Sequence, residues 1–372
     1  MEKKILAISH AFLKKINLSF YEELSKDKKF KITCLLPENL LYNNKKIYPD
    51  FKSQSKYLKI KKLKLSNNST RFFYLSNLKS VIKSAKPDYV ILDNDTVSVQ
   101  SIILFYYSFF FNYKLCYFCN ENNLKNIFTD FNIKKFIKLL IVYPVNFIIK
   151  FKVFKVFCYT NQIKENYNIL GFKNKTCLMP LGYDEKVFNL KKKRKKDFFA
   201  ISYFGRIIPE KGIHILINSL KNLKYKNWKF MLDIDQVENI FYFKSIIKLF
   251  KKNFKGKKIK FIRCNHYNIA KYMGHSDVVV LPSLHQEQYG RVIQESVACG
   301  AIAVGSDIGA IPEIIKDKEL LFESGNHKAL SIILNKLYNK SFYNKKFKKL
   351  YQKIKNERTI QKQLLVFKKE LK

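Results

Sequence analysis

Short apolar segments alternate with longer segments of helical periodicity along the whole chain. In the first half the apolar segments are rich in Ile, Val, Phe and Tyr, which is typical of strands covered on both faces of a parallel sheet. We expect strands there at Lys4–Ser9, Lys31–Leu36, Tyr89–Leu92, Lys114–Cys119 and Val156–Tyr159, and helices at Phe72–Ala85, Val97–Phe111 and Ile133–Lys152. The alternation predicts an α/β fold with parallel sheets.

The same alternation starts again after a break in composition. Residues 189–196 read Asn-Leu-Lys-Lys-Lys-Arg-Lys-Lys, a solvated basic run that suits neither a strand nor a core helix. Beyond it we expect strands at Phe199–Phe204, Lys229–Ile234, Lys258–Arg263, Val278–Leu281, Ala301–Gly305 and Glu319–Phe322, and helices at Gly212–Leu223, Val237–Asn253, Gly290–Cys299 and His327–Tyr338. The predicted organisation is a domain over residues 1–188, a linker over 189–198, a second domain over 199–341 and a helical tail over 342–372. Two doubly wound domains place a ligand cleft at the carboxyl ends of their strands.

Glycine is scarce and unevenly distributed. The 372 residues include 11 glycines, whereas average usage would give roughly 26, and the first of them is Gly171. An N-terminal G-x-G-x-x-G dinucleotide loop and an N-terminal P-loop both need glycine where the backbone approaches phosphate, so both are excluded. A glycine-lined phosphate site therefore belongs to the second half of the chain.

The chain is strongly basic, with 71 Lys and Arg against 29 Asp and Glu and a net charge of +42. Such a field attracts nucleic acid, an anionic membrane surface or a phosphorylated ligand. The chain is also rich in Lys, Asn, Ile, Phe and Tyr, whose codons are rich in A and T, so genome composition explains the charge equally well. Charge alone does not decide the function.

Cysteine usage and apolar segment length indicate the compartment. The seven cysteines are odd in number and scattered, which favours buried thiols in a reducing compartment. Cys116 and Cys119 have C-x-x-C spacing, but no second pair or clustered His completes a zinc site. The apolar stretches Ile102–Phe111 and Phe136–Ile149 are shorter than the roughly 20 residues that span a bilayer. We expect a cytoplasmic protein without a metal site, either soluble or peripheral on the inner face of the cell membrane.

Two segments of the second half carry candidate chemistry, and the first follows the strand that ends at Phe204. It reads Gly205-Arg206, then Pro-Glu-Lys-Gly with Lys211 as its cation, and then a helix. Arg can donate two parallel hydrogen bonds to phosphate oxygens, and Lys acts as a point charge, so the pair suits a diphosphate. In a chain this rich in cations, two unrelated surface charges are the alternative.

The second segment runs from residue 281 to 313. A strand ends at Pro282, a loop presents Glu287, and Gly290 opens a helix whose free N–H groups favour an anion. Glu295 lies in the second turn of that helix, where its carboxylate can accept hydrogen bonds from the two hydroxyls of a ribose. The alternative is a solvated loop carboxylate and a helical Glu favoured by the helix dipole.

These segments together carry a resemblance. Glu287 and Glu295 have E-x7-E spacing within P-S-x3-E-x2-G-x4-E-x3-C-G, downstream of Gly205-Arg206…Lys211-Gly212 and of the P-x-G-x-D…F pattern in Met179–Phe188. The pattern resembles the retaining glycosyltransferases of family 4, the glycosyl transferases group 1. It covers about half the chain, from Phe157 to Phe322.

The resemblance implies a GT-B fold, in which two Rossmann-like domains face each other across a cleft and a C-terminal helix crosses back. It implies no metal and no other cofactor. Arg206 and Lys211 would hold the donor diphosphate and neutralise the departing nucleotide. Glu287 would contact the transferred sugar beside the reacting carbon, and Glu295 would hold the ribose. The other donor-binding residues would be Gly205, where the chain turns, and Gln288, Tyr289 and Gly290, which would offer backbone N–H groups.

The first half matches the family less well, because it lacks the glycines that usually follow the first strand. His10 stands there instead, Asp95 follows the strand at Tyr89–Leu92, and Glu121 follows the strand at Lys114–Cys119. We take these three as candidates for the acceptor side. A structural histidine is the alternative for His10.

The resemblance thus implies a retaining glycosyltransferase. Its donor would be a UDP- or GDP-sugar and its acceptor a glycan or lipid-linked glycan, in the synthesis of cell-surface polysaccharide or lipopolysaccharide. The alternatives are a nucleotide-sugar epimerase of the same fold, a degenerate non-catalytic member, and a basic nucleic-acid-binding protein. No RNA-binding aromatic motif supports the last, so we expect no nucleic-acid partner. The helix at Ile133–Lys152 mixes Phe, Ile and Leu with Lys, which suits a face on an anionic membrane or a buried helix with snorkelling lysines.

Overall fold

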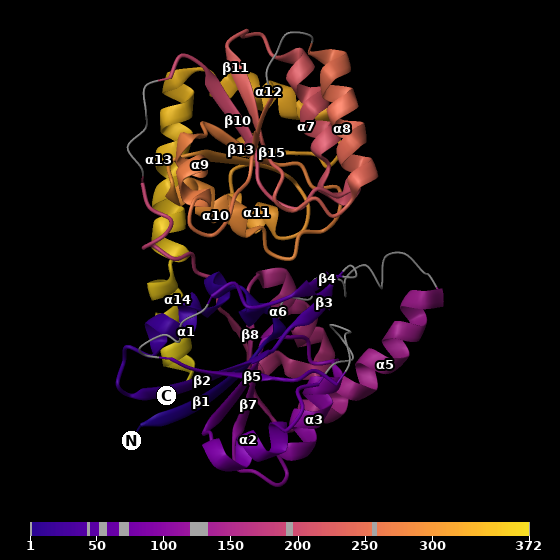
Figure 1. Cartoon of the computed structure of the whole chain (residues 1–372), viewed down its shortest axis with the longest axis vertical. Helices are drawn as coiled ribbons and strands as arrows, with labels where there is room; N and C mark the ends of the chain where they lie inside the picture. The colour runs from indigo at the N-terminus through magenta and orange to yellow at the C-terminus, as the bar shows by residue number, and fades with distance from the viewer. Residues whose placement is uncertain are drawn as a thin grey trace. The chain divides into compact units, whose positions relative to one another are not determined.

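The computed structural model forms two compact units, shown in Figure 1: residues 1–180 with 363–372, and residues 181–362. The structure describes residues 2–42, 45–51, 58–66, 74–119, 133–190, 196–254 and 259–371. The unit boundary follows Pro180, whereas the sequence analysis placed a domain boundary after residue 188. Of the proposed linker, the described part is residues 189–190 and 196–198.

The N-terminal unit is built on a parallel sheet of seven strands in the order β5-β2-β1-β6-β7-β8-β9. Its strands are β1 Lys3–Ile8, β2 Phe30–Pro37, β5 Lys59–Leu63, β6 Tyr89–Leu92, β7 Lys114–Cys119, β8 Val153–Cys158 and β9 Thr176–Leu178, beside the hairpin β3 Leu40–Tyr42 and β4 Lys45–Ile47. All four residues of β6 are buried, because helices cover both faces of the sheet and an apolar side chain is needed at every position. The strand at the β5 edge reads Lys-Ile-Lys-Lys-Leu and is half-exposed, so it shows no apolar run and the sequence analysis missed it.

The helices of the N-terminal unit are α1 Ser19–Leu24, α2 Leu78–Ala85, α3 Val99–Tyr107, α5 Ile133–Ile149 and α6 Asn161–Tyr167. Two of them, α3 and α6, begin after residues whose side chains cap them. Ser98 accepts a hydrogen bond from the Ser101 N–H at 3.2 Å, and Thr160 accepts one from the Ile163 N–H at 3.1 Å. The last helix, α14 Ile360–Glu370, starts in the C-terminal unit and ends in this one, which confirms the predicted crossing back. Its Phe367 is fully buried against Phe20 and Phe118.

The C-terminal unit repeats the same architecture with a parallel sheet in the order β12-β11-β10-β13-β14-β15. Its strands are β10 Phe199–Tyr203, β11 Trp228–Asp233, β12 Ile259–Ile262, β13 Val278–Leu281, β14 Ile302–Ser306 and β15 Leu321–Phe322. Its helices are α7 Ile213–Ser219, α8 Ile240–Asn253, α9 Ile269–His275, α10 Arg291–Ala298, α11 Ile311–Ile315, α12 His327–Leu337 and α13 Lys340–Glu357. In Figure 1, α7 and α8 lie on one side of this sheet and α9, α10 and α13 on the other. The predicted fold class, two Rossmann-like domains with parallel sheets, is confirmed.

Two further expectations concern cysteines and membrane spans. All seven cysteines are free thiols, and six of them are buried. Within the described part of the chain, none of the helices combines the length and the apolar character that crossing a bilayer requires.

Candidate active site

The strand order of the C-terminal sheet reverses between β10 and β13. In doubly wound sheets, ligands bind outside the carboxyl ends of the strands at such a reversal. The chain leaves β10 through Gly205 and Arg206, and it leaves β13 into the loop that carries Glu287. Both candidate motifs therefore start from the two strands that flank the expected ligand position.

The loops after β10 and β13 touch through their backbones. Gly212 has a φ of +64°, and a Cβ atom at this residue would lie 1.9 Å from the carbonyl oxygen of Pro282. Next to it, the Leu284 N–H donates a hydrogen bond of 2.8 Å to the Glu210 carbonyl. Only glycine permits this approach, so the sequence at Gly212 determines how closely the two motif loops pack.

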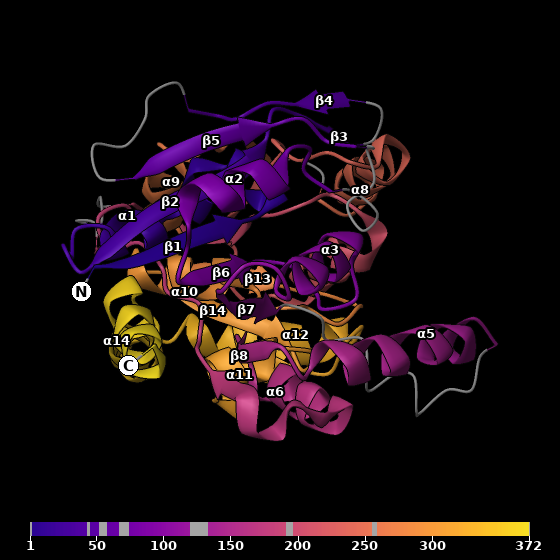
Figure 2. The same ribbon diagram turned by 90° about the horizontal axis from the view of Figure 1, so that it is seen from below.

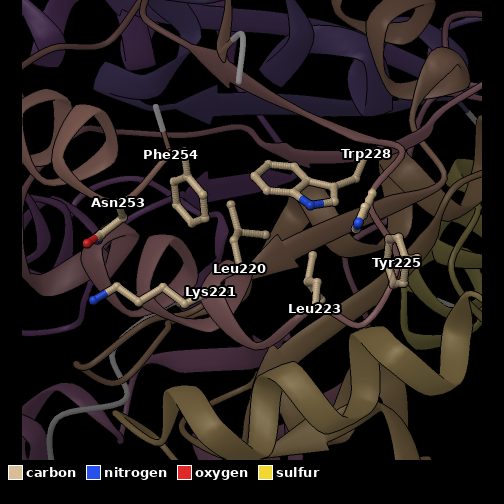
Figure 3. A pocket seen from close by; sticks show the side chains of 8 residues that line it. Leu220, Lys221, Leu223, Tyr225, Trp228, Asn253 and Phe254 are labelled. Atoms are coloured by element: carbon tan, nitrogen blue, oxygen red, sulfur yellow. The ribbon is translucent and has the colours of Figure 1, made fainter. Parts of the chain in front are cut away.

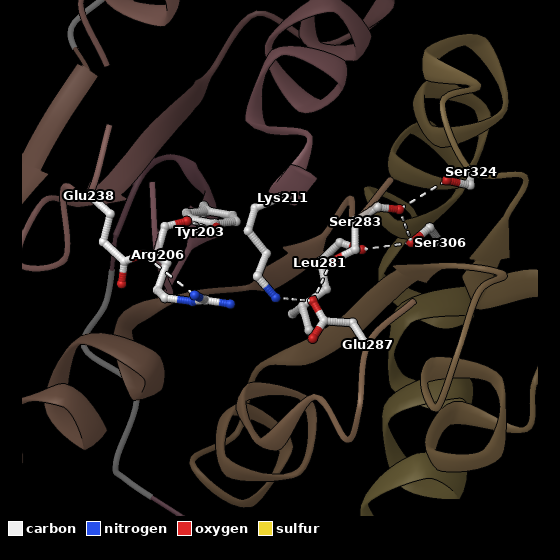
Figure 4. Close-up of polar contacts among 9 residues, drawn as sticks. All are labelled: Tyr203, Arg206, Lys211, Glu238, Leu281, Ser283, Glu287, Ser306 and Ser324. Carbon is white, nitrogen blue, oxygen red and sulfur yellow. Dashed lines mark hydrogen bonds and ion pairs between the residues drawn. The ribbon is translucent and has the colours of Figure 1, made fainter. Parts of the chain in front are cut away.

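Lys211 and Glu287 meet where these loops touch. The Lys211 ammonium forms an ion pair with Oε1 of Glu287, and the Ser283 hydroxyl donates a 2.5 Å hydrogen bond to the same oxygen (Figure 4). The two side chains are 21% and 12% exposed. A pair this far from solvent is screened less than a surface pair, and the serine restricts the carboxylate further. The site thus holds a cation and a carboxylate side by side in defined positions.

The Glu287 loop is anchored to β14 and to the turns that follow β14 and β15. The Ser283 carbonyl accepts hydrogen bonds from the Ser306 hydroxyl at 2.8 Å and from the Ser324 hydroxyl at 3.0 Å (Figure 4). The Ala310 N–H donates to the Glu287 carbonyl at 3.0 Å. These contacts orient the carboxylate before any ligand arrives.

Arg206 is held loosely by comparison. Its NH1 lies 3.4 Å from Oε2 of Glu238, its side chain is 43% exposed, and the Tyr203 hydroxyl donates to its carbonyl at 2.7 Å. In Figure 4 the guanidinium is directed toward the side on which Lys211 and Glu287 meet. An exposed ion pair of this length contributes little to stability, so Arg206 can exchange Glu238 for a phosphate at small cost.

Glu295 is a buried carboxylate on α10, the helix that begins after Gly290. It is 5% exposed, and Nε of Arg291 lies 3.3 Å from its Oε1. Burial raises the pKa of Glu295, and Arg291 opposes that shift. A carboxylate at this depth gains from further hydrogen-bond donors, and a pair of vicinal hydroxyls is a donor group of the right kind.

The side chain of Tyr289 makes contacts in addition to the backbone N–H role that the sequence suggested for this residue. Its side chain is buried, and its hydroxyl accepts a 2.7 Å hydrogen bond from Arg358 and donates one of 2.7 Å to the Leu181 carbonyl. Gln294 donates to the same carbonyl at 3.0 Å. The tyrosine side chain therefore anchors the loop, while the neighbouring Gln288 is exposed. Sequence reasoning missed Arg358, which is one of 71 basic residues and lies in no motif.

Two of the acceptor-side candidates lie beyond the carboxyl ends of neighbouring strands in the middle of the N-terminal sheet. His10 follows β1 and Asp95 follows β6, and these strands are paired neighbours. Burial lowers the pKa of His10. The third candidate, Glu121, lies outside the described residues. The carboxyl ends of β1 and β6 thus bring two of the three candidates to the same place in their unit.

A separate hollow of about 460 Å³ lies at the opposite end of the C-terminal sheet, where β11 begins (Figure 3). Trp228, Phe254 and Leu220 line it, with Lys221 among its polar residues. Its lining includes none of the donor-site candidates. The candidate active site is therefore distinct from this hollow.

Comparisons with known proteins connect the C-terminal unit to one family. Residues 184–357 match the model of the family described as glycosyl transferases group 1. A curated relative, the phosphatidylinositol N-acetylglucosaminyltransferase GPI3 subunit of Saccharomyces cerevisiae, is 22% identical over 256 residues, which cover 62% of this chain and 55% of the relative. The chain spans about half the length of the curated relatives that it matches first.

Solved structures match the whole chain. Sucrose-phosphate synthase from Thermosynechococcus elongatus has a TM-score of 0.75 at 15% identity, covering 99% of this chain and 98% of that one. Alr3699/HepE of Anabaena, in complex with UDP and glucose, has a TM-score of 0.72 at 16% identity, covering 100% and 99%. At such identities the likeness shows the fold, which is GT-B as expected.

Proposed function

We propose that this chain, whose residues 184–357 match the glycosyl transferases group 1 family, is a retaining glycosyltransferase that uses a nucleotide-diphosphate sugar. The observation that carries the proposal is the Lys211–Glu287 pair, held by Ser283 beside the strand reversal of the C-terminal sheet. A transferase needs positive charge at the departing diphosphate and a carboxylate at the sugar. These two residues supply both.

Each residue has a definite task in this proposal. Arg206 and Lys211 bind the diphosphate and stabilise the negative charge that grows on it as the glycosidic bond breaks. Glu287 binds hydroxyls of the transferred sugar next to the anomeric carbon, which acquires oxocarbenium character. Glu295 holds the ribose. Because two side chains supply the positive charge, we propose that no metal is required.

The proposed donor comes from a structural neighbour, and the proposed acceptor from the candidate residues of the N-terminal unit. UDP is the first candidate nucleotide, since the solved Anabaena structure holds UDP and glucose, and GDP is the second. We propose a glycan or lipid-linked glycan as acceptor. His10 and Asp95, beyond the carboxyl ends of β1 and β6, would contact it. Synthesis of cell-surface polysaccharide or lipopolysaccharide, at the inner face of the membrane, is the corresponding process.

Thermal stabilisation by nucleotides tests the donor site. With EDTA present, UDP or GDP at about 100 times its dissociation constant adds about 2.7 kcal/mol of stability, and we expect a rise in Tm of about 5 °C. Arg206→Ala and Glu295→Ala remove most of this rise because each loses a contact with the nucleotide. Arg263 is exposed, so Arg263→Ala is the matched control for the loss of one positive charge, and we expect this variant to show the full rise in Tm. Absence of stabilisation by either nucleotide, or equal stabilisation in all variants, contradicts the proposed site.

The pH dependence of donor binding provides a second test. The raised pKa of Glu295 means that its carboxyl is protonated at a higher pH than an ordinary Glu, and the protonated form accepts ribose hydroxyls less well. Affinity for UDP-glucose is therefore expected to fall as pH is lowered through that raised pKa. Calorimetric titration of Glu295→Gln, which stays neutral, should show weaker binding without this fall. If the affinity of both proteins changed with pH in the same way, the proposal that Glu295 binds the ribose would be wrong.

A further inference from the structure

Helix α3 buries two polar residues beside Leu104 and exposes apolar side chains. Its polar residues Gln100 and Ser101 are buried: Gln100 accepts a hydrogen bond from the Leu75 N–H at 2.9 Å, and Ser101 lies 2.6 Å from the Tyr117 hydroxyl. Apolar residues face solvent instead, with Tyr106 58% exposed. A surface helix ordinarily buries its apolar stripe, so this face is built to contact something other than water.

Helix α5 presents a second apolar stripe. Val142, Asn146 and Ile149 are buried at helical spacing, whereas Phe147 on the opposite side of the helix and Phe151 just after its end are 58% and 69% exposed. Figures 1 and 2 both show α5 extending away from the sheet of the N-terminal unit. From Val142 on, apolar residues therefore lie on the exposed side of α5 as well as beside Asn146 on its buried side.

The two stripes meet where the segment after α3 contacts the segment after α5, and we call them together the aromatic face. The Lys152 ammonium lies 4.5 Å from the ring centre of Phe109 after α3, and the Lys150 ammonium lies 4.1 Å from that of Phe147 on α5. Its members are Ile102, Tyr106, Phe109, Phe110, Leu140, Tyr143, Phe147, Ile148 and Phe151. These nine are among 21 exposed large hydrophobic residues in the described part of the chain, although they lie within 50 residues of sequence. Such concentration marks an interaction surface.

The charge around the aromatic face favours an anionic partner. Residues 99–119 and 142–152 contain no Asp or Glu and three lysines, namely Lys114, Lys150 and Lys152. Aromatic rings with interleaved lysines suit the headgroup level of a bilayer, where rings enter the apolar boundary and ammonium groups meet lipid phosphates. A protruding helix reaches such a flat surface more readily than a recessed one.

We propose that the aromatic face docks the chain on an anionic lipid bilayer, with the exposed stripes of α3 and α5 entering at headgroup level. The inference rests on the proposed function, which places the process at the inner face of the membrane. It adds which surface contacts the membrane and which lipids that surface binds. Its test requires no sugar transfer. Vesicle binding without nucleotide binding would overturn the proposed transfer alone, and nucleotide binding without vesicle binding would overturn this face alone.

Vesicle co-sedimentation of the full chain tests the proposal. Vesicles of phosphatidylcholine with about 30% phosphatidylglycerol are compared with phosphatidylcholine alone, at low salt and at about 0.5 M NaCl, which screens surface charge. We expect Phe147→Ser with Phe151→Ser to lower partitioning into the anionic vesicles about tenfold or more at both salts. Phe241→Ser is the matched control, because Phe241 is 81% exposed on α8 of the other unit, and it should bind like the parent.

Two outcomes would overturn the proposal. Equal partitioning of the double variant and the parent would mean that the net charge of +42 binds the vesicles without the aromatic face. A concentration-dependent dimer of the parent, lost in the double variant while vesicle binding is unchanged, would mean that a second copy covers this surface.

A tryptophan reporter measures insertion directly. The chain has one tryptophan, Trp228, which is 6% exposed and belongs to the other unit. In Phe151→Trp we expect brominated lipids to quench a fluorescence component that the parent lacks, while Trp228 provides the unquenched reference. Equal quenching of parent and variant would contradict insertion at α5.

Discussion

Replacement of Glu287 by alanine is expected to lower kcat/KM for sugar transfer by about 1,000-fold while UDP binding survives. The carboxylate acts on the sugar, where charge develops in the transition state, so its loss affects the chemical step. In the free protein, however, the same carboxylate pairs with Lys211. Its removal leaves the whole Lys211 charge available to the diphosphate, and UDP affinity should be unchanged or higher. Steady-state kinetics with a UDP-sugar and calorimetry with UDP measure the two effects separately.

Two further variants locate the effect of Glu287. Ser283→Ala keeps the carboxylate but removes its 2.5 Å hydrogen bond, so we expect a smaller loss of about tenfold in transfer. Glu357→Ala removes a carboxylate that is 45% exposed on α13 and should change nothing. Full transfer by Glu287→Ala would show that another residue acts on the sugar. A parallel loss of UDP binding would place Glu287 in the nucleotide site instead.

Strands buried on both faces could be predicted from the sequence with little error. The ranges expected at Tyr89–Leu92 and Val278–Leu281 are the bounds of β6 and β13, because a fully covered strand has apolar residues at every position. The strands β5 and β9 were missed. Each is short and only partly buried, so neither needs a continuous apolar run.

The sequence predicted which residues belong to the candidate site better than it predicted which of them touch. The sequence assigned Lys211 to the diphosphate and Glu287 to the sugar, without expecting them to touch. Their pairing depends on β10 lying beside β13, and that neighbourhood is a property of the sheet rather than of either motif. Arg358 could not be found at all, since its contact with Tyr289 joins residues 69 positions apart.

Replacement of Gly212 by alanine is expected to destabilise the C-terminal unit by about 2–4 kcal/mol and to weaken UDP binding. Its φ of +64° disfavours any L side chain, and a Cβ atom would lie 1.9 Å from the Pro282 carbonyl oxygen. Since backbone atoms cannot yield as a flexible side chain does, the loops that carry Lys211 and Glu287 must separate. Urea unfolding followed by Trp228 fluorescence reports on this unit, because the tryptophan lies on β11.

Gly325→Ala separates the two causes of this loss. Gly325 has a φ of +84°, but the nearest atom to an added Cβ is a Leu284 methyl carbon at 3.7 Å, an ordinary contact. The control therefore carries the backbone strain of about 1 kcal/mol without the clash, and we expect its UDP affinity to match that of the parent. The difference between the two variants measures what the close approach of the motif loops contributes. Equal losses would mean that the loops can move apart freely, and that the Lys211–Glu287 pair does not depend on Gly212.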